Sequence, residues 1–133
     1  MRRQVIEMFC LFVLVLSMGS MSIASPEPPQ GRIAFGRNIG GNEDIYVVDP
    51  DGRSLSRLTD DPGCDWQPTW SPDGRQIAFA SNREGHFRIY IANADGSNVR
   101  RLTHGEGSDG DPAWSPDGKW IAYSHYDPGD GRG

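Results

Sequence analysis

The sequence has 133 residues, with 13 Lys and Arg against 18 Asp and Glu, which gives a formal net charge of −5. A chain of this length suits one domain, and a charged fraction of 23% is ordinary for a globular protein. The acidic balance argues against nucleic-acid binding, because phosphate backbones require clustered Lys and Arg.

The N-terminal segment has the pattern of a secretory signal peptide. A positive start at Met1–Arg3 precedes an apolar run from Met8 to Met18, and small residues follow up to Ala24. We therefore expect residues 1–24 to be a signal peptide cleaved near Ala24, residues 25–31 to be a Pro-rich linker, and the protein to be periplasmic or secreted. An uncleaved membrane anchor is the alternative, although the apolar run is short for a membrane span. After cleavage Cys64 is the only cysteine, which excludes an intramolecular disulfide.

The rest of the chain repeats with a period of 44 residues and no gaps. Ile33-Ala34-Phe35 aligns with Ile77-Ala78-Phe79 and then with Ile121-Ala122-Tyr123. The pentapeptide WSPDG occurs at Trp70–Gly74 and again at Trp114–Gly118. A catalytic motif is needed once per active site, whereas a copied structural unit needs its signature in each copy. The period falls in the range of a four-stranded propeller blade.

Each copy reads as short strands with period-two alternation, separated by Gly, Asn and Asp. The expected strands are the regions of Ile33, Ile45 and Leu55 in the first copy, Pro68–Ser71, Ile77–Ser81, Phe87–Asn93 and Val99–Thr103 in the second, and two within Pro112–Tyr123 in the third. The strongest hairpin signals are Asp51-Gly52, Asp73-Gly74, Asp95-Gly96 and Asp117-Gly118, in which Gly takes the positive-φ position. No part of the chain after residue 24 has a helical period. The sequence predicts an all-β meander of four-stranded antiparallel sheets that pack on both faces.

These residues resemble the PD40, or WD40-like, repeat of TolB-type six-bladed β-propellers. The resemblance covers about residues 32–124. The residues that carry the structural repeat signature are Pro68, Trp70, Ser71, Pro72, Asp73 and Gly74, their counterparts Pro112, Trp114, Ser115, Pro116, Asp117 and Gly118, and the turn pairs Asp51, Gly52, Asp95 and Gly96. The resemblance implies a partial, open β-propeller of about two and a quarter blades, with each tryptophan filling a gap between blades. It also implies an exported protein that binds other proteins without catalysis, envelope proteins among them. Similar repeats form the propeller domains of prolyl-oligopeptidase-like peptidases, so a propeller whose hydrolase domain is missing is the alternative.

No catalytic, cofactor-binding or metal-binding motif is recognisable. The sequence has no G-x-S-x-G elbow, no H-E-x-x-H, no P-loop and no Cys pair at metal spacing. His86 and His104 fall in turns, and we expect residues 125–133 to be a polar, disordered tail. The acidic set is Asp60, Asp61, Asp65, Asp109 and Asp111. Turn capping is the simpler interpretation of this set, and a calcium loop is the other. We therefore expect a non-enzymatic protein without cofactors.

Two and a quarter blades do not close a propeller, which typically has four to eight. An open arc leaves unpaired strand edges, which promote association. Either the sequence is a fragment of a longer propeller, or copies associate with Pro112–Tyr123 pairing onto the first blade of a partner. In both cases we expect protein partners, no nucleic acid, and no stable membrane span once the signal is cleaved.

Overall fold

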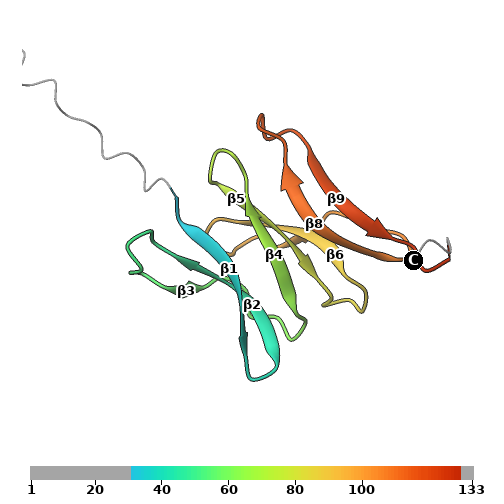
Figure 1. Ribbon diagram of the computed structural model, residues 1–133, viewed down its shortest axis with the longest axis horizontal. Coiled ribbons are helices and arrows are strands. Elements are labelled where there is room, and N and C mark those ends of the chain that lie inside the picture. The colour runs from blue at the N-terminus through green and yellow to red at the C-terminus, as the bar shows by residue number, and fades with distance from the viewer. Residues whose placement is uncertain (1–30, 130–133) are drawn as a thin grey trace, which may run out of the picture. The chain divides into compact units, whose positions relative to one another are not determined.

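The computed structural model describes residues 31–129, and all secondary structure in this range is β (Figure 1). Nine strands form three antiparallel sheets in chain order. The first sheet holds β1 (Ile33–Ile39), β2 (Asn42–Val48) and β3 (Ser56–Arg57); the second holds β4 (Asp65–Trp70), β5 (Gln76–Ser81), β6 (Arg88–Asn93) and β7 (Arg100–Arg101); the third holds β8 (Ser108–Trp114) and β9 (Ile121–Tyr126). The predicted all-β, open propeller arc is confirmed, with three, four and two strands in successive blades.

The WSPDG pentapeptide forms the turn between the first two strands of a blade. In the second blade the Gly74 amide donates to the Ser71 carbonyl at 2.9 Å, and Gly74 has a φ of +67°. The Asp73 carboxylate accepts from the Ser71 hydroxyl at 2.6 Å and from the Arg75 amide at 3.1 Å. These two bonds, the first of them the stronger influence, lower the pKa of Asp73. The third blade repeats the whole arrangement at Ser115–Lys119.

The third and fourth strands of a blade are joined by a threonine hydroxyl. Thr59 Oγ1 accepts from the buried Ile45 amide at 2.9 Å, and Thr103 Oγ1 accepts from the buried Ile89 amide at 3.0 Å. Each hydroxyl therefore connects the fourth strand to the third beyond the residues of β3 and β7. For this reason only Arg100 and Arg101 of the expected strand Val99–Thr103 form a regular strand, and Thr103 is connected to the third strand through its side chain.

Both faces of the second blade are buried. Ile77 and Phe79 point into a cluster shared with Ile45 of the first blade, with Trp70 packed against it. On the opposite face Ala78 and Ala80 belong to a second cluster, against which Trp114 and Ile121 of the third blade pack. Small residues therefore occur on the face that the third blade approaches, as the period-two alternation predicts.

The two outer blades are incomplete within the described residues. The first blade has no counterpart of β4, which is the first and innermost strand of the second blade. The third blade has no counterparts of β6 and β7, which are the third and fourth strands of the second blade. The tail begins later than expected, because β9 continues through His125 and Tyr126, which pair with Asp109 and Ser108 of β8. The predicted signal peptide, most of the linker and the last four residues lie outside the described range.

Candidate interaction groove

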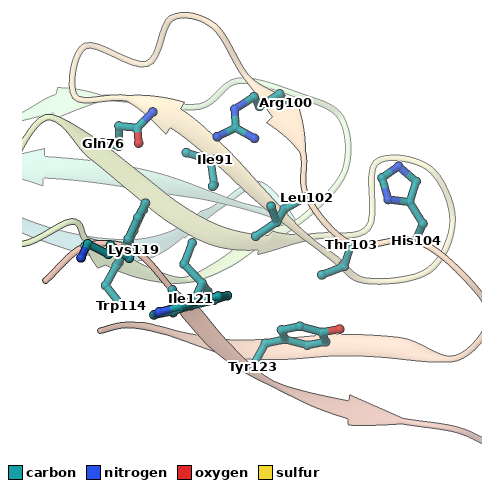
Figure 2. A pocket seen from close by; sticks show the side chains of 12 residues that line it. Gln76, Ile91, Arg100, Leu102, Thr103, His104, Trp114, Lys119, Ile121 and Tyr123 are labelled. Carbon is teal, nitrogen blue, oxygen red and sulfur yellow. The ribbon is translucent and has the colours of Figure 1, made fainter. Parts of the chain in front are cut away.

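A groove of about 550 Å³ lies between the second and third blades (Figure 2). Its lining residues are Gln76, Ile91, Arg100, Leu102, Thr103, His104, Trp114, Gly118, Lys119, Trp120, Ile121 and Tyr123. In Figure 2, Ile91 and Leu102 of the second blade face Trp114, Ile121 and Tyr123 of the third. The floor of the groove is apolar, since Leu102, Trp114 and Ile121 all pack against the second core cluster.

The preceding interface shows why this groove is open. Between the first and second blades, the corresponding space holds Tyr90 and Ala92, which project from β6, the third strand of the second blade. Tyr90 lies opposite Phe79 in the strand pairing, and their rings stack with centroids 6.1 Å apart. The third blade has no third strand among the described residues. The groove is therefore the space that a third strand would fill.

Large aromatic side chains remain exposed beside this space. Trp120 is 74% exposed and Tyr123 is 46% exposed. Tyr123 occupies the position of Phe79, which is fully buried in the second blade. Tyr123 differs from Phe79 in exposure because the described residues of the third blade include no counterpart of β6.

The groove carries positive charge in a chain of negative net charge. Arg100 comes from the wall formed by β7 and Lys119 from the turn between β8 and β9, and His104 lies near one end. Of the described residues that line the groove, none is Asp or Glu. Lys119 does lie 3.8 Å from Asp117 outside the lining, but both side chains are more than half exposed, so this pair is weak. The groove therefore favours an acidic ligand.

The predicted signature residues do not gather into one site. Trp70 packs between the first and second blades and Trp114 between the second and third. Trp114 Nε1 donates to the Thr69 carbonyl at 3.3 Å. Pro68 lies in β4 and Pro112 is buried in β8. The residues Ser71, Pro72, Asp73 and Gly74 form one turn, their counterparts Ser115, Pro116, Asp117 and Gly118 form another, and Asp51, Gly52, Asp95 and Gly96 lie in the turns that follow β2 and β6.

Of these signature residues, only Trp114 and Gly118 line the groove. Sequence reasoning missed the exposed and charged ones, although the alignment of the copies holds the signal. At the 44-residue spacing, Arg100 replaces Ser56, His104 replaces Asp60 and Trp120 replaces Gln76. These substitutions exchange neutral or acidic groups for basic or aromatic ones on a single surface.

The repeated aspartates are ion-pair partners, so the turn-cap interpretation is wrong for them. Asp65 is fully buried, and both of its carboxylate oxygens lie 3.1 Å from Nη2 of Arg83. Asp109 is 3% exposed, 2.6 Å from Nδ1 of His125 and 3.7 Å from Nη1 of Arg88. Asp65 is the first residue of β4 and Asp109 is the second residue of β8, and a buried carboxylate at either position needs a charged partner.

Asp111 also has a structural partner. Its Oδ1 accepts from Nε2 of Gln67 at 2.5 Å, while its amide donates to Oε1 of Gln67 at 2.8 Å. Both residues have positive φ, at bulges in the inner strands. The pair connects successive blades, so Asp111 does not act as a free ligand.

Within residues 31–129, no group of three or more His, Cys, Asp and Glu side chains could hold a metal ion. The same part of the chain contains no helix long and apolar enough to cross a membrane. His86 and His104 are exposed, as expected for turn residues, and Cys64 is a free, half-buried loop residue. The groove is thus the feature best suited to binding.

Comparisons with known proteins agree with this architecture. Residues 14–132 match the family model for the TolB beta propeller domain (PD40). The crystal structure of TolB from Acinetobacter baumannii superposes with a TM-score of 0.68 at 33% identity, over 77% of this chain and 26% of that one. The Tol-Pal system protein TolB of Geobacter sulfurreducens is 44% identical over 49 residues, which are 37% of this chain and 11% of that protein.

A more distant likeness, to the tricorn protease, has a TM-score of 0.52 at 21% identity over 74% of this chain and 9% of that one, and it shows the fold alone. The chain spans about a quarter of the solved TolB and about a ninth of the Geobacter protein. The family match covers most of the sequence and the fold agrees with it. The chain belongs to the TolB β-propeller (PD40) family.

Proposed function

We propose that this chain is an exported, non-catalytic protein-interaction module of the bacterial cell envelope. The observation that carries the proposal is the groove, where exposed Trp120 and Tyr123 lie beside the basic Arg100 and Lys119. Such a combination of aromatic and basic side chains is typical of protein interfaces. Curated relatives are named as Tol-Pal system proteins, which supports an envelope role.

Export is supported by the signal-peptide pattern at residues 1–24. The test is to express the full chain in a Gram-negative host and to determine the N-terminus and the compartment of the product. A periplasmic product that begins at Ser25 agrees with the proposal. A cytoplasmic product that retains Met1 contradicts it.

Partner binding is tested by placing a photo-crosslinking amino acid in the groove. Trp120 is replaced by p-benzoylphenylalanine in one variant, and Leu55, which is 49% exposed in the first blade, is replaced in the control. We expect a discrete crosslinked protein from the Trp120 variant alone after irradiation of intact cells. Equal crosslinking from both positions, or none from either, contradicts an interaction role for the groove.

The alternative, a propeller that regulates a serine peptidase, has no feature of the described residues in its favour. The tricorn likeness carries fold and not activity. Addition of the purified chain to a serine peptidase of the prolyl-oligopeptidase type is therefore expected to leave the rate of peptide hydrolysis unchanged.

A further inference from the structure

We propose that Asp51 is a site of spontaneous isoaspartate formation, and that the serine of the WSPDG signature protects the Asp-Gly pair that follows it from this reaction. This chemistry is independent of the proposed function, which concerns a partner protein. One tetrapeptide occurs twice in the chain, as Pro50-Asp51-Gly52-Arg53 and as Pro72-Asp73-Gly74-Arg75. The two Asp-Gly pairs therefore share their intrinsic reactivity, and a difference in rate between them reports the structure around each pair.

The reaction takes place within one Asp-Gly pair. The Gly52 amide nitrogen attacks the carboxyl carbon of Asp51 and closes a succinimide ring, while one carboxyl oxygen leaves as water with the amide proton and the carboxyl proton. Water then opens the ring. Cleavage of the bond from nitrogen to the side-chain carbonyl restores aspartate, and cleavage of the bond to the backbone carbonyl leaves isoaspartate, with the chain running through Cβ. Water is lost and regained, so the mass is unchanged and no oxidant is needed.

The backbone of the two turns is alike around the reacting atoms. The Gly52 amide donates to the Asp49 carbonyl at 2.8 Å, and the Gly74 amide donates to the Ser71 carbonyl at 2.9 Å. Both glycines have positive φ, at +79° and +67°. Each Asp carboxylate accepts from the amide two residues further on, at 2.9 Å in the first turn and 3.1 Å in the second. These features do not separate the two sites.

The difference lies in the residue before the proline. The Ser71 hydroxyl donates to the Asp73 carboxylate at 2.6 Å. The same position before Asp51 holds Asp49, whose ionised carboxylate can only accept hydrogen bonds. The Asp51 carboxylate also lies 3.6 Å from Nε of Arg53, but both side chains are exposed, so this pair contributes little. Asp73 is thus held by a hydroxyl hydrogen bond that Asp51 does not have within residues 31–129.

A hydroxyl holds the carboxylate in the other two Asp-Gly turns as well. Asp117 accepts from the Ser115 hydroxyl and Asp95 accepts from the Ser97 hydroxyl, each at 2.6 Å. In both turns this hydrogen bond is the main cause that lowers the pKa of the Asp carboxyl. Among the Asp-Gly turns between residues 31 and 129, only the turn at Asp51 has no hydroxyl donor for its carboxylate.

The hydroxyl opposes both requirements of ring closure. The carboxyl group must turn toward the glycine amide, and it must be neutral, because water leaves a neutral carboxyl more readily than an ionised one. A hydrogen bond from a hydroxyl to the ionised carboxylate stabilises the position and the charge state that do not react. Loss of one such bond changes an equilibrium by about tenfold, so we expect Asp51 to react about tenfold faster than Asp73.

The test follows both sites in one sample of the purified full chain. The chain is incubated in heavy-oxygen water at neutral pH, returned to ordinary water and digested with trypsin. Each passage through the succinimide introduces one heavy oxygen atom, even when aspartate is restored. Trypsin separates the sites, because Asp51 falls in residues 38–53 and Asp73 in residues 58–75. We expect label to accumulate about tenfold faster at Asp51 in the folded chain, and equally at both sites in urea.

Two variants at position 49 separate the hydroxyl from the charge. Asp49→Ser creates the Ser-Pro-Asp-Gly sequence of the signature and should slow the reaction at Asp51 to the rate at Asp73. Asp49→Ala removes the same carboxylate without providing a hydroxyl and should leave the rate at Asp51 unchanged. Ser71→Ala should raise the rate at Asp73 to that at Asp51. The effect of Asp49→Ser is a gain of protection, which partial unfolding of a variant cannot produce.

Three outcomes overturn the inference. The first is an equal rate at Asp51 and Asp73 in the folded chain. The second is a difference that persists in urea, which would assign it to sequence outside the tetrapeptide. The third is equal protection by Asp49→Ala and Asp49→Ser, which would assign the difference to the charge of Asp49. None of these outcomes involves the groove, so the proposed function is tested separately.

Discussion

Trp114 Nε1 donates a hydrogen bond to the Thr69 carbonyl across the boundary between the second and third blades, at 3.3 Å. Trp70, its equivalent one repeat earlier, has a buried Nε1 that finds no acceptor among residues 31–129. The acceptor of Trp114 lies on β4, an inner strand, and the described part of the first blade has no inner strand. Within residues 31–129, the same signature residue is thus paired in one copy and has no partner in the other.

This difference predicts unequal costs for the same substitution. Trp114→Phe removes a hydrogen bond, whereas Trp70→Phe removes a buried donor that has no acceptor within residues 31–129. Both lose the same ring volume, so Trp114→Phe should destabilise the chain by about 1–2 kcal/mol more than Trp70→Phe. Urea unfolding followed by circular dichroism gives both free energies. A greater loss for Trp70→Phe would show that its Nε1 is paired.

The threonine that links the third and fourth strands offers a second test. Thr103→Val leaves the buried Ile89 amide without its acceptor, which should lower the free energy of unfolding by about 1–3 kcal/mol. Thr103→Ser keeps the hydroxyl and should recover most of the loss. If serine and valine are equally destabilising, the methyl packing of Thr103 matters and the hydrogen bond does not.

The buried pair of Asp65 and Arg83 should stabilise the second blade far more than an exposed pair. Arg83→Met keeps the length of the side chain but leaves a fully buried carboxylate without its cation, at a cost of about 3–5 kcal/mol. Arg53→Met breaks the exposed pair with Asp51, at 3.6 Å, and should change stability by less than about 0.5 kcal/mol. Thermal unfolding of both variants at neutral pH decides the comparison, and equal midpoints would refute it.

Tyr90 makes the stability of the chain depend on alkaline pH. Burial, together with the hydrogen bond from its hydroxyl to Glu84 at 2.8 Å, raises the pKa of Tyr90 from 10.0 to about 12. The folded state therefore holds the neutral phenol more tightly than the unfolded state does. This contribution is complete below pH 10 and is lost as the pH rises from 10 to about 12. The difference in unfolding free energy between wild type and Tyr90→Phe should decline over this range, and a constant difference would contradict it.

The repeat made much of the fold predictable because its local rules are strong. A period of 44, with Asp-Gly at fixed offsets, determines where strands turn, and Gly52, Gly74, Gly96 and Gly118 all have positive φ. Period-two alternation along residues 77–80 separates Ile77 and Phe79 from Ala78 and Ala80, and the two pairs belong to different core clusters on the two faces of β5. These features depend on neighbours in the chain, which a sequence displays directly.

The ion pairs could not be predicted in the same way, because they join residues that the repeat does not relate. Arg83 pairs with Asp65, yet the residues that correspond to Arg83 in the other copies are Ile39 and Asp127. The extent of β9 was also missed, since His125 reads as a tail residue until Asp109 is placed beside it. Such partners depend on how blades and strands pack.

The groove became visible only when the third blade was seen to have two strands. Trp120 and Tyr123 read as ordinary strand residues, and their exposure follows from the absence of a covering strand among the described residues. The departures from the repeat at Arg100 and Trp120 were present in the sequence. A comparison of where the copies differ, in addition to where they agree, would have indicated this surface.

The central claim is that the surface around Trp120 and Tyr123 contacts a partner protein, and photo-crosslinking in intact cells tests it most directly. With p-benzoylphenylalanine in place of Trp120, which is 74% exposed, we predict one discrete crosslinked protein. The same amino acid in place of Leu55 should give none. Equal crosslinking from both positions, or none from either, would contradict the account.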